Sequence, residues 1–126
     1  MNDLVVVVRR KLLEIHPRVY FDTAPDDAVF PYVVFNFPND FTVEELEVFN
    51  LDVDVWDRPV DGDTNEIDAV SSGIWRGLHK CRYMDNNIQF SVYRANRLMP
   101  DDDDPLIRRR KLIFELRYFD RRLNSE

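Results

Sequence analysis

Very few side chains in this sequence belong to the types that carry out catalysis or bind transition metals. The chain has two histidines, His16 and His79, and one cysteine, Cys81. His16 precedes a proline, and His79 ends a helical pattern, where the helix dipole favours a histidine without any chemistry. His79 and Cys81 flank a helix-to-strand junction, so their side chains should diverge, whereas a nucleophilic pair needs hydrogen-bond contact. We expect Cys81 to be a small buried thiol, with no internal disulfide and no Cys/His zinc site.

The acidic residues are the remaining candidates for a metal site. With Gly62 at position 6 of a calcium loop, Pro59 falls at a ligand position, and proline has no side-chain ligand. Asp52 and Asp54 share one face of a strand, where they could hold a hard cation with a third carboxylate or keep a wet face soluble. The run Asp101 to Asp104 could bind a cation loosely, dock a basic surface or form a solvated loop tip. We expect no bound metal and no cofactor.

Motifs of the common enzyme classes are missing. Restriction-type nucleases carry an aspartate followed by Glu-x-Lys on a strand, whereas Glu115-Leu116-Arg117 has arginine in place of the lysine. The sequence has no glycine-rich phosphate loop, no Gly-x-Ser-x-Gly and no His-Glu-x-x-His. We therefore predict that the protein is not an enzyme, and a metal-dependent nuclease is the less favoured alternative.

Length and composition fit one small globular domain spanning residues 1–126. The chain is 44% hydrophobic and 33% charged, with only three glycines and no internal repeat or flexible linker. No apolar run approaches the roughly 18 residues that a membrane span needs. The stretch from Leu4 to Val8 is too short for a signal peptide and is soon followed by basic residues. We expect a chain that is made in the cytoplasm and does not enter a membrane.

Charge is distributed unevenly along the chain. The net charge is −7, but residues 1–104 carry 10 basic and 21 acidic side chains, whereas residues 105–126 carry 7 basic and 3 acidic ones. This balance repels free nucleic acid and offers complementary surfaces to other copies or to protein partners. It favours protein–protein contact over sequence-specific nucleic-acid binding, although an acidic face is most often simply solvated.

The elements that position these residues follow from the hydrophobic pattern. Residues 3–15 predict a helix, with Leu4, Val8, Leu12 and Ile15 at helical spacing, although four consecutive valines favour a strand instead. Residues 32–37 predict a central strand, covered on both faces and bounded by Pro31 and Pro38. From Phe49 to Val55 the pattern alternates between a dry face and a wet face that carries Asp52 and Asp54, and it indicates a bulge near residue 48.

The second half of the chain predicts a helix and two long strands. Asp63 or Thr64 begins a helix that ends at Leu78, with Glu66 placed for a capping box to Asp63. Gly73 and Gly77 border its apolar stripe, where they would let a neighbouring backbone come close or allow tight packing on the protein's own sheet. Strands 88–98 and 108–119 follow a hairpin turn at residues 85–87, and the loop 99–105 separates them.

These elements predict an α+β domain in the order α-β-β-α-β-β, with a mostly antiparallel sheet and the helices packed on one face. Strands of 11 and 12 residues are longer than a helix of ordinary length covers, so part of the sheet should protrude. The outward row of the last strand mixes Lys111 and Arg117 with Ile113 and Phe119. Such an edge is either blunted by charge or pairs with another chain, and we infer self-assembly through it.

Several segments resemble a known family. Residues 19–34 contain Ala24-Pro25-Asp26-Asp27-Ala28 followed by Phe30-Pro31-Tyr32-Val33-Val34, a later strand ends Trp56-Asp57-Arg58, and a helix containing Glu66 follows. These features, over roughly residues 10–119, are similar to the small tail completion or tail terminator proteins of long-tailed bacteriophages and prophages. The Val-rich first helix and the longer Asp101 to Asp104 loop depart from the usual pattern.

The resemblance implies a structural role. Members of that family form a hexameric ring that caps the tail tube, stops its growth and joins the tail to the head, and such a ring could let DNA pass through it. It implies a protein of the virion at the head–tail junction, assembled in the host cytoplasm, with itself, the tail tube protein and a head-completion or connector protein as partners. A head-completion (connector stopper) ring protein is the alternative from the same pathway.

Candidate interface residues follow from charge and exposure. For contacts between neighbouring subunits we expect Asp52 and Asp54 of one copy to meet basic residues of the next. The full set of subunit-interface candidates is Asp52, Asp54, Arg108, Arg109, Arg110, Ile113, Arg117 and Phe119. The candidates for docking a partner are the loop residues Asp101, Asp102, Asp103 and Asp104.

Overall fold

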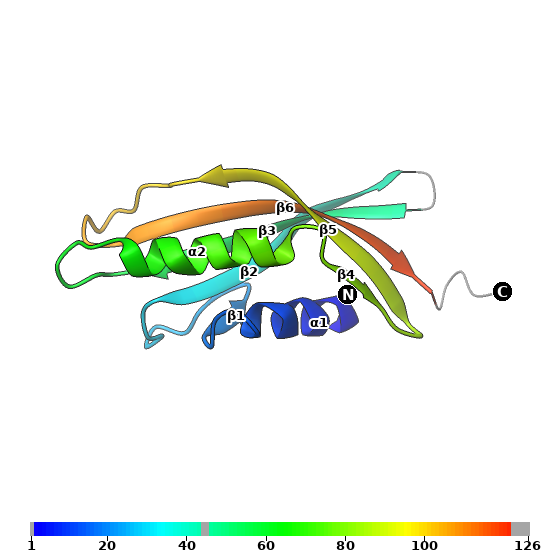
Figure 1. The fold of residues 1–126 in the computed structure, drawn as a ribbon, viewed down its shortest axis with the longest axis horizontal. Helices are drawn as coiled ribbons and strands as arrows, with labels where there is room; N and C mark the ends of the chain where they lie inside the picture. The colour runs from blue at the N-terminus through cyan, green and yellow to red at the C-terminus, as the bar shows by residue number, and fades with distance from the viewer. Residues whose placement is uncertain (1, 44–45, 122–126) are drawn as a thin grey trace.

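The computed structural model describes residues 2–43 and 46–121, and within them two helices and six strands follow one another (Figure 1). The helices are α1 (Asn2–Leu13) and α2 (Asn65–Leu78). The strands are β1 (Val19–Phe21), β2 (Tyr32–Val43), β3 (Leu46–Asp57), β4 (Arg82–Met84), β5 (Ile88–Leu98) and β6 (Arg108–Asp120). The α+β class and the order of the main elements are confirmed. Neither helix is long and apolar enough to cross a bilayer.

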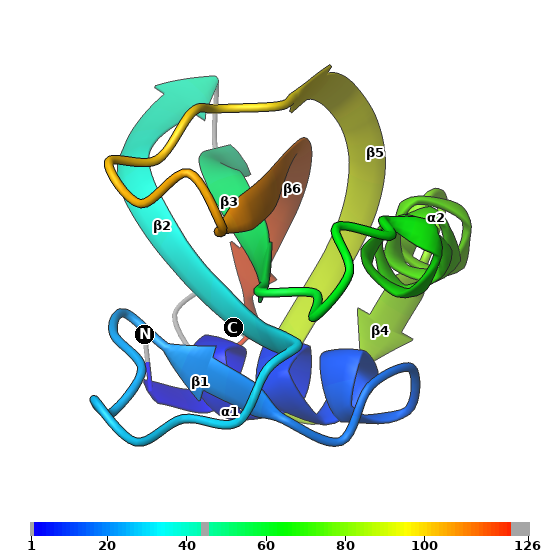
Figure 2. The same ribbon diagram turned by 90° about the vertical axis from the view of Figure 1, so that its left-hand side faces the viewer.

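All six strands form one sheet in the order β1-β2-β3-β6-β5-β4. Neighbouring strands are antiparallel, except that β1 runs parallel to β2. The two edge strands have three residues each, whereas the four inner strands have 11 to 13. Viewed end-on, the sheet is strongly curled, with β2 and β5 on either side of β3 and β6 (Figure 2).

Helix α1 forms despite its run of valines. Leu4, Val8 and Leu12 are almost fully buried, while Val6 on the opposite side is 54% exposed, so the pattern has helical periodicity. β-branched residues lower helix propensity only slightly, and burial of one face outweighs that loss. The helix ends at Leu13, two residues earlier than predicted, and the Leu12 carbonyl accepts hydrogen bonds from the N–H groups of Ile15 and His16.

Helix α2 lies where it was predicted, but its start is built differently. Thr64 is the N-cap residue, and its side chain makes no capping hydrogen bond. Asp63, the residue before the N-cap, accepts a hydrogen bond at its Oδ1 from the Asn65 N–H instead, at 2.9 Å. The predicted capping box is therefore wrong: with Thr64 as the cap, Glu66 is only the second helical residue and is not at the position that reaches back.

Strands β2 and β3 form a long hairpin that the sequence did not predict. Pro38 does not end β2; the strand continues to Val43 because a bulge lies between Asn36 and Asn39, where the ladder to β3 shifts. The bulge spares Pro38 from a ladder position that would need its missing N–H. The predicted bulge near residue 48 is wrong, since Val48 pairs regularly with Phe41 and Arg117.

Both helices pack on the same face of the sheet, as predicted. The two helices contribute Leu4, Val8, Leu12, Ile67, Ile74 and Leu78 to a single buried core. The strands contribute side chains of one parity, among them Val33, Phe35, Leu51, Val53, Val55, Phe90, Val92, Leu112, Phe114 and Leu116. The other face of the sheet carries no helix and is called the helix-free face below. The β2–β3 hairpin and the end of β6 extend beyond the helices, so part of the sheet protrudes (Figure 1).

The glycines of α2 allow a close approach to the segment after α1. A Cβ on Gly77 would lie 2.9 Å from Ile15 Cδ1, and one on Gly73 would lie 3.3 Å from Ile15 Cγ2. The sequence predicted the close approach of a neighbouring backbone, whereas the structure places the Ile15 side chain there. This contact joins the two helices over the sheet.

Candidate assembly surface

The residues with catalytic potential are held in structural roles at separate places. His16 is buried, and its Nε2 lies 2.8 Å from the Pro31 carbonyl, to which it must donate. His79 Nδ1 accepts from the Arg94 N–H at 3.1 Å. Cys81 is half-buried, and burial raises the pKa of its thiol. Within residues 2–43 and 46–121, no three His, Cys, Asp or Glu side chains are grouped to hold a metal ion.

The helix-free face carries two ion pairs at its centre. Lys111 Nζ lies 3.2 Å from Asp52 Oδ2, and Arg109 Nη2 lies 3.4 Å from Asp54 Oδ1. In the β3–β6 ladder Lys111 is directly opposite Asp54, yet it pairs with Asp52, and Asp54 pairs with Arg109. Each acid therefore pairs with a base that lies diagonally across the two strands. Both acids therefore have basic partners in their own chain.

The expectation that Asp52 and Asp54 form a wet acidic surface is wrong. These residues are only 9% and 6% exposed, because the curled sheet and the basic side chains of β6 cover them. Burial raises the pKa of Asp54, and the nearby Lys111 and Arg109 lower it part of the way back. The alternating pattern places these acids on the correct face, but it carries no information about what covers that face.

Arg109 is held between Asp54 and aromatic rings. Its guanidinium carbon lies 4.0 Å from the Trp56 ring centroid, and Trp56 stacks on Tyr32 with centroids 6.2 Å apart. Its buried Nε has no hydrogen-bond partner within the described residues. A guanidinium stacked on an aromatic face keeps much of its stabilisation without that bond. This end of the helix-free face is a packed structural cluster.

The arginines predicted as subunit-interface candidates divide between the two faces of the sheet. Arg110 Nε pairs with Asp68 of α2 at 2.9 Å, and Arg108 Nη1 donates to the Pro105 carbonyl at 2.7 Å. Arg109 lies on the helix-free face, and Arg117 lies farther along β6 on that same face. Arg117 contacts Glu115 at 3.6 Å and is 47% exposed.

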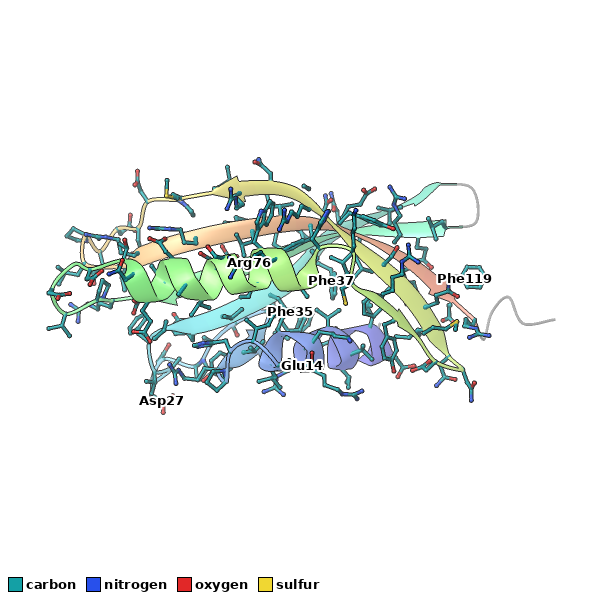
Figure 3. All side chains as sticks on the ribbon, in the orientation of Figure 1. Glu14, Asp27, Phe35, Phe37, Arg76 and Phe119 are labelled. Atoms are coloured by element: carbon teal, nitrogen blue, oxygen red, sulfur yellow. The ribbon has the colours of Figure 1, made fainter. Side chains whose placement is uncertain are left out.

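An open groove occupies the far end of the helix-free face. Its volume is about 490 Å³, and we call it the distal groove. Leu46, Arg82, Tyr83, Met84, Gln89, Phe90, Ser91, Tyr93, Arg117 and Phe119 line it. Arg117 lies over the Tyr93 ring at 4.7 Å, and a hydrogen bond with Ser91, together with the nearby Arg117 and Arg82, lowers the pKa of Tyr93. Figure 3 labels Phe119 at this end of the molecule.

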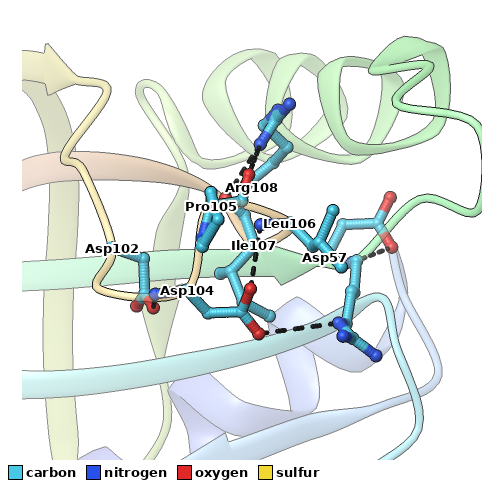
Figure 4. Close-up of polar contacts among 8 residues, drawn as sticks. Asp57, Asp102, Asp104, Pro105, Leu106, Ile107 and Arg108 are labelled. Atoms are coloured by element: carbon cyan, nitrogen blue, oxygen red, sulfur yellow. Dashed lines mark hydrogen bonds and ion pairs between the residues drawn. The ribbon is translucent and has the colours of Figure 1, made fainter.

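The acidic loop, residues 99–107, lies at the opposite end and is held in shape by its own polar groups. Asp102 Oδ1 accepts from the Asp104 N–H, and Asp104 Oδ1 accepts from the Leu106 N–H, both at 2.9 Å (Figure 4). Asp104 also pairs with Arg58 at 3.7 Å. Asp101 and Asp103 are exposed. The loop therefore presents two of its four carboxylates outward from a turn that the other two maintain.

Sequence reasoning located part of the distal groove. It selected Ile113, Arg117 and Phe119 on β6, of which Arg117 and Phe119 line the groove. It missed Leu46, Arg82, Met84 and Tyr93. Arg82 and Met84 pair with Ser91 and Gln89. That register places their side chains on the face of Tyr93, a signal that the hairpin turn at 85–87 already contained.

No protein-family model matches the chain, and no curated protein matches it. Solved structures do share its fold. One is a chain in the virion of a native gene transfer agent particle, with a TM-score of 0.63 and 12% sequence identity. The match covers 85% of this chain and 83% of that chain. At this identity the likeness establishes a common α+β fold over almost the whole length of both chains.

Proposed function

We propose that this protein is a structural component of a phage-like virion. The observation that carries the proposal is the shared fold with a chain of a gene transfer agent virion, over 85% of this chain. The site chemistry is consistent with it, since the histidines and the cysteine are structural and the described acids form no metal cluster. The more specific role is that of a tail terminator: a homo-oligomeric ring, a hexamer by family resemblance, that caps the tail tube at the head–tail junction.

The surfaces suit a role in assembly. The two ends of the molecule differ in chemistry: one carries the acidic loop and the other carries the distal groove with Arg82 and Arg117. A molecule with unlike ends can bind copies of itself in one direction and different partners on its other faces. Asp52 and Asp54 pair with Lys111 and Arg109 and so join β3 to β6 within one copy. Ile113, Arg117 and Phe119 remain candidates for contact between copies.

The decisive experiment is mixing with tail tubes. Purified protein is added to tube protein during polymerisation, and tube length and tube ends are recorded by electron microscopy. A terminator decorates one end of each tube as a ring and shortens the tubes as its concentration rises. A head-completion protein leaves tube growth unchanged and binds the portal side. Absence of binding to either component would contradict the proposal.

The enzyme alternative has its own test. A metal-dependent nuclease would bind Mg²⁺ or Mn²⁺ and cleave DNA in their presence. We expect no cleavage of linear or circular duplex DNA with either ion. Turnover that is lost on mutation of Glu115 would overturn the structural assignment.

A further inference from the structure

The acidic loop and the distal groove have complementary chemistry. The loop region combines exposed carboxylates at Asp101 and Asp103 with exposed apolar side chains: Met99 is 73% exposed and Leu106 is 54% exposed. A surface that alternates acids with exposed large apolar groups is unusual for a merely solvated loop tip. Its natural counterpart is an apolar recess with basic residues at its edge.

The distal groove is such a recess. Leu46, Met84 and Phe119 give it an apolar lining, and Met84 is 64% exposed. Arg82 and Arg117 are both exposed along it. The nearby acid Glu115 lies 3.6 Å from Arg117, in a partly exposed pair, and such pairs contribute little and are readily exchanged. The groove therefore offers two guanidinium groups beside an open apolar surface.

The two features cannot meet within one molecule. Figure 1 places the loop after β5 at one end of the long axis, whereas β4 and the end of β6, which line the groove, lie at the other. A contact between them must join different copies, and it uses unlike surfaces on the two partners. Contacts of this heterologous kind generate closed rings when the rotation between copies closes, and filaments when it does not.

We propose that the distal groove of one copy receives the acidic loop of the next, so that Arg82 and Arg117 face Asp101 and Asp103 while Met99 and Leu106 enter the apolar recess. The self-contact is argued from these surfaces alone; its closure into a ring rests on the proposed function. Asp102 and Asp104 keep the loop in its bound shape, which lowers the entropy lost on docking.

Two charge-reversal variants test the contact from its two sides. The groove variant is R82E/R117E, and the loop variant is D101K/D103K, which leaves the turn-forming Asp102 and Asp104 intact. All four substitutions are at exposed positions, so each variant should keep the wild-type circular dichroism spectrum and unfolding midpoint. Each variant alone should self-associate about tenfold or more weakly than the wild type in sedimentation velocity.

Mixing the two variants gives the sharper result. In the mixture the intact groove of the loop variant faces the intact loop of the groove variant, and the reversed groove faces the reversed loop, so a one-to-one mixture should recover association with the two variants alternating. Combining all four substitutions in one chain should restore association, because the reversed charges again face each other. An isologous interface, in which the same surface of both copies meets, would restore association neither in the mixture nor in the fourfold variant.

Matched controls carry the same charge changes elsewhere. R76E/K80E changes the charge as the groove variant does, and D26K/D27K changes it as the loop variant does, in each case at exposed residues that neither line the groove nor belong to the acidic loop. Both controls should associate like the wild type. Loss of association in the controls would mean that net charge alone governs assembly, which overturns the inference.

The failure of this inference is distinguishable from failure of the proposed function. Rings that persist in R82E/R117E show that copies meet elsewhere, which overturns the inference while the tube-capping result stands. Wild-type protein that stays monomeric at micromolar concentration and caps no tubes overturns both. Wild-type protein that is monomeric alone but caps tubes overturns only the self-contact described here.

Discussion

The buried charge cluster predicts an asymmetric response to mutation. Asp54 is nearly buried, with its side chain 9% exposed, whereas the side chains of its partners Arg109 and Lys111 are 21% and 29% exposed. Removing the acid leaves two bases that can reach water. Removing Arg109 leaves a buried carboxylate whose remaining basic neighbour, Lys111, is also paired with Asp52. The two substitutions should therefore differ in cost although they break the same ion pair.

The magnitudes follow from burial. We expect Asp54→Asn to change the free energy of unfolding by less than about 1 kcal/mol, because it removes the buried charge and leaves partly exposed bases that water can solvate. Arg109→Met should cost about 3 kcal/mol, because breaking a buried pair leaves an uncompensated charge. Part of that cost, about 1 kcal/mol, is the lost stacking on Trp56. The double variant should recover most of the remainder.

The pH dependence has a definite sign. Burial holds the pKa of Asp54 above its ordinary value of 3.8 in the folded protein. A raised acid pKa means that the folded state binds the proton more tightly than the unfolded state does. The contribution of Asp54 to stability is therefore fully present below the unfolded pKa and is lost as the pH rises through the folded pKa. Arg109→Met raises this pKa further. Its deficit should be smaller at about pH 4 than at about pH 7, and Asp54→Asn should abolish that difference.

Urea unfolding followed by tryptophan fluorescence and circular dichroism measures all four proteins of this cycle at both pH values. The reasoning is refuted if Asp54→Asn costs as much as Arg109→Met, or if the cost of Arg109→Met is the same with and without Asp54. Either result would mean that burial does not dominate the electrostatics of Asp54.

Other parts of the fold give three further predictions. Gly77→Ala should stabilise the wild type less than it stabilises Ile15→Val, because Ile15 Cδ1 would lie 2.9 Å from the new Cβ and must move, whereas in Ile15→Val that atom is absent and the gain should be about 1 kcal/mol; equal effects in both backgrounds under urea unfolding would contradict this. Because burial raises the pKa of the Cys81 thiol, a disulfide reagent at mildly alkaline pH should react with it more slowly than with a free cysteine, and urea should remove the difference; fast reaction in the folded protein would count against it. Tyr83→Phe should lower the unfolding midpoint through loss of the 2.8 Å hydrogen bond to Asp85, whereas an unchanged midpoint would show that this bond does not contribute to stability.

The fold was predictable where a local pattern dictates it. Helix α2 and the inward row of β6 follow directly from side-chain periodicity, and the structure confirms both. The β2–β3 hairpin was missed because Pro38 normally ends a strand, and only the tertiary pairing with β3 shows that a bulge accommodates it. The N-cap of α2 was left open between Asp63 and Thr64, since both residue types are good caps, and only the structure shows that Thr64 is the cap and that no capping box to Asp63 forms.

The site was predictable only as a list of exposed residues. Alternation placed Asp52, Asp54, Ile113 and Arg117 on one face, but pairing across strands decides which of these charges are neutralised within the chain. The distal groove needs three elements that are distant in sequence: the start of β3, the β4–β5 hairpin and the end of β6. The hairpin turn at 85–87 indicates only which β4 side chains share a face with Tyr93, and no single segment indicates that the three elements meet to form a groove.

The charge imbalance along the chain acquires a spatial meaning from the fold. Asp52 and Asp54 on β3 are paired with Lys111 and Arg109 of β6, so they contribute little to the outward field. Acidic residues in the loops at 22–28, 57–64 and 99–107 gather at one end of the long axis (Figure 1). An isologous dimer through that end would oppose like charges, whereas a head-to-tail contact brings it against Arg82 and Arg117. The electrostatics therefore favour heterologous assembly, and because screening weakens exposed ion pairs, the assembly should loosen as salt concentration rises.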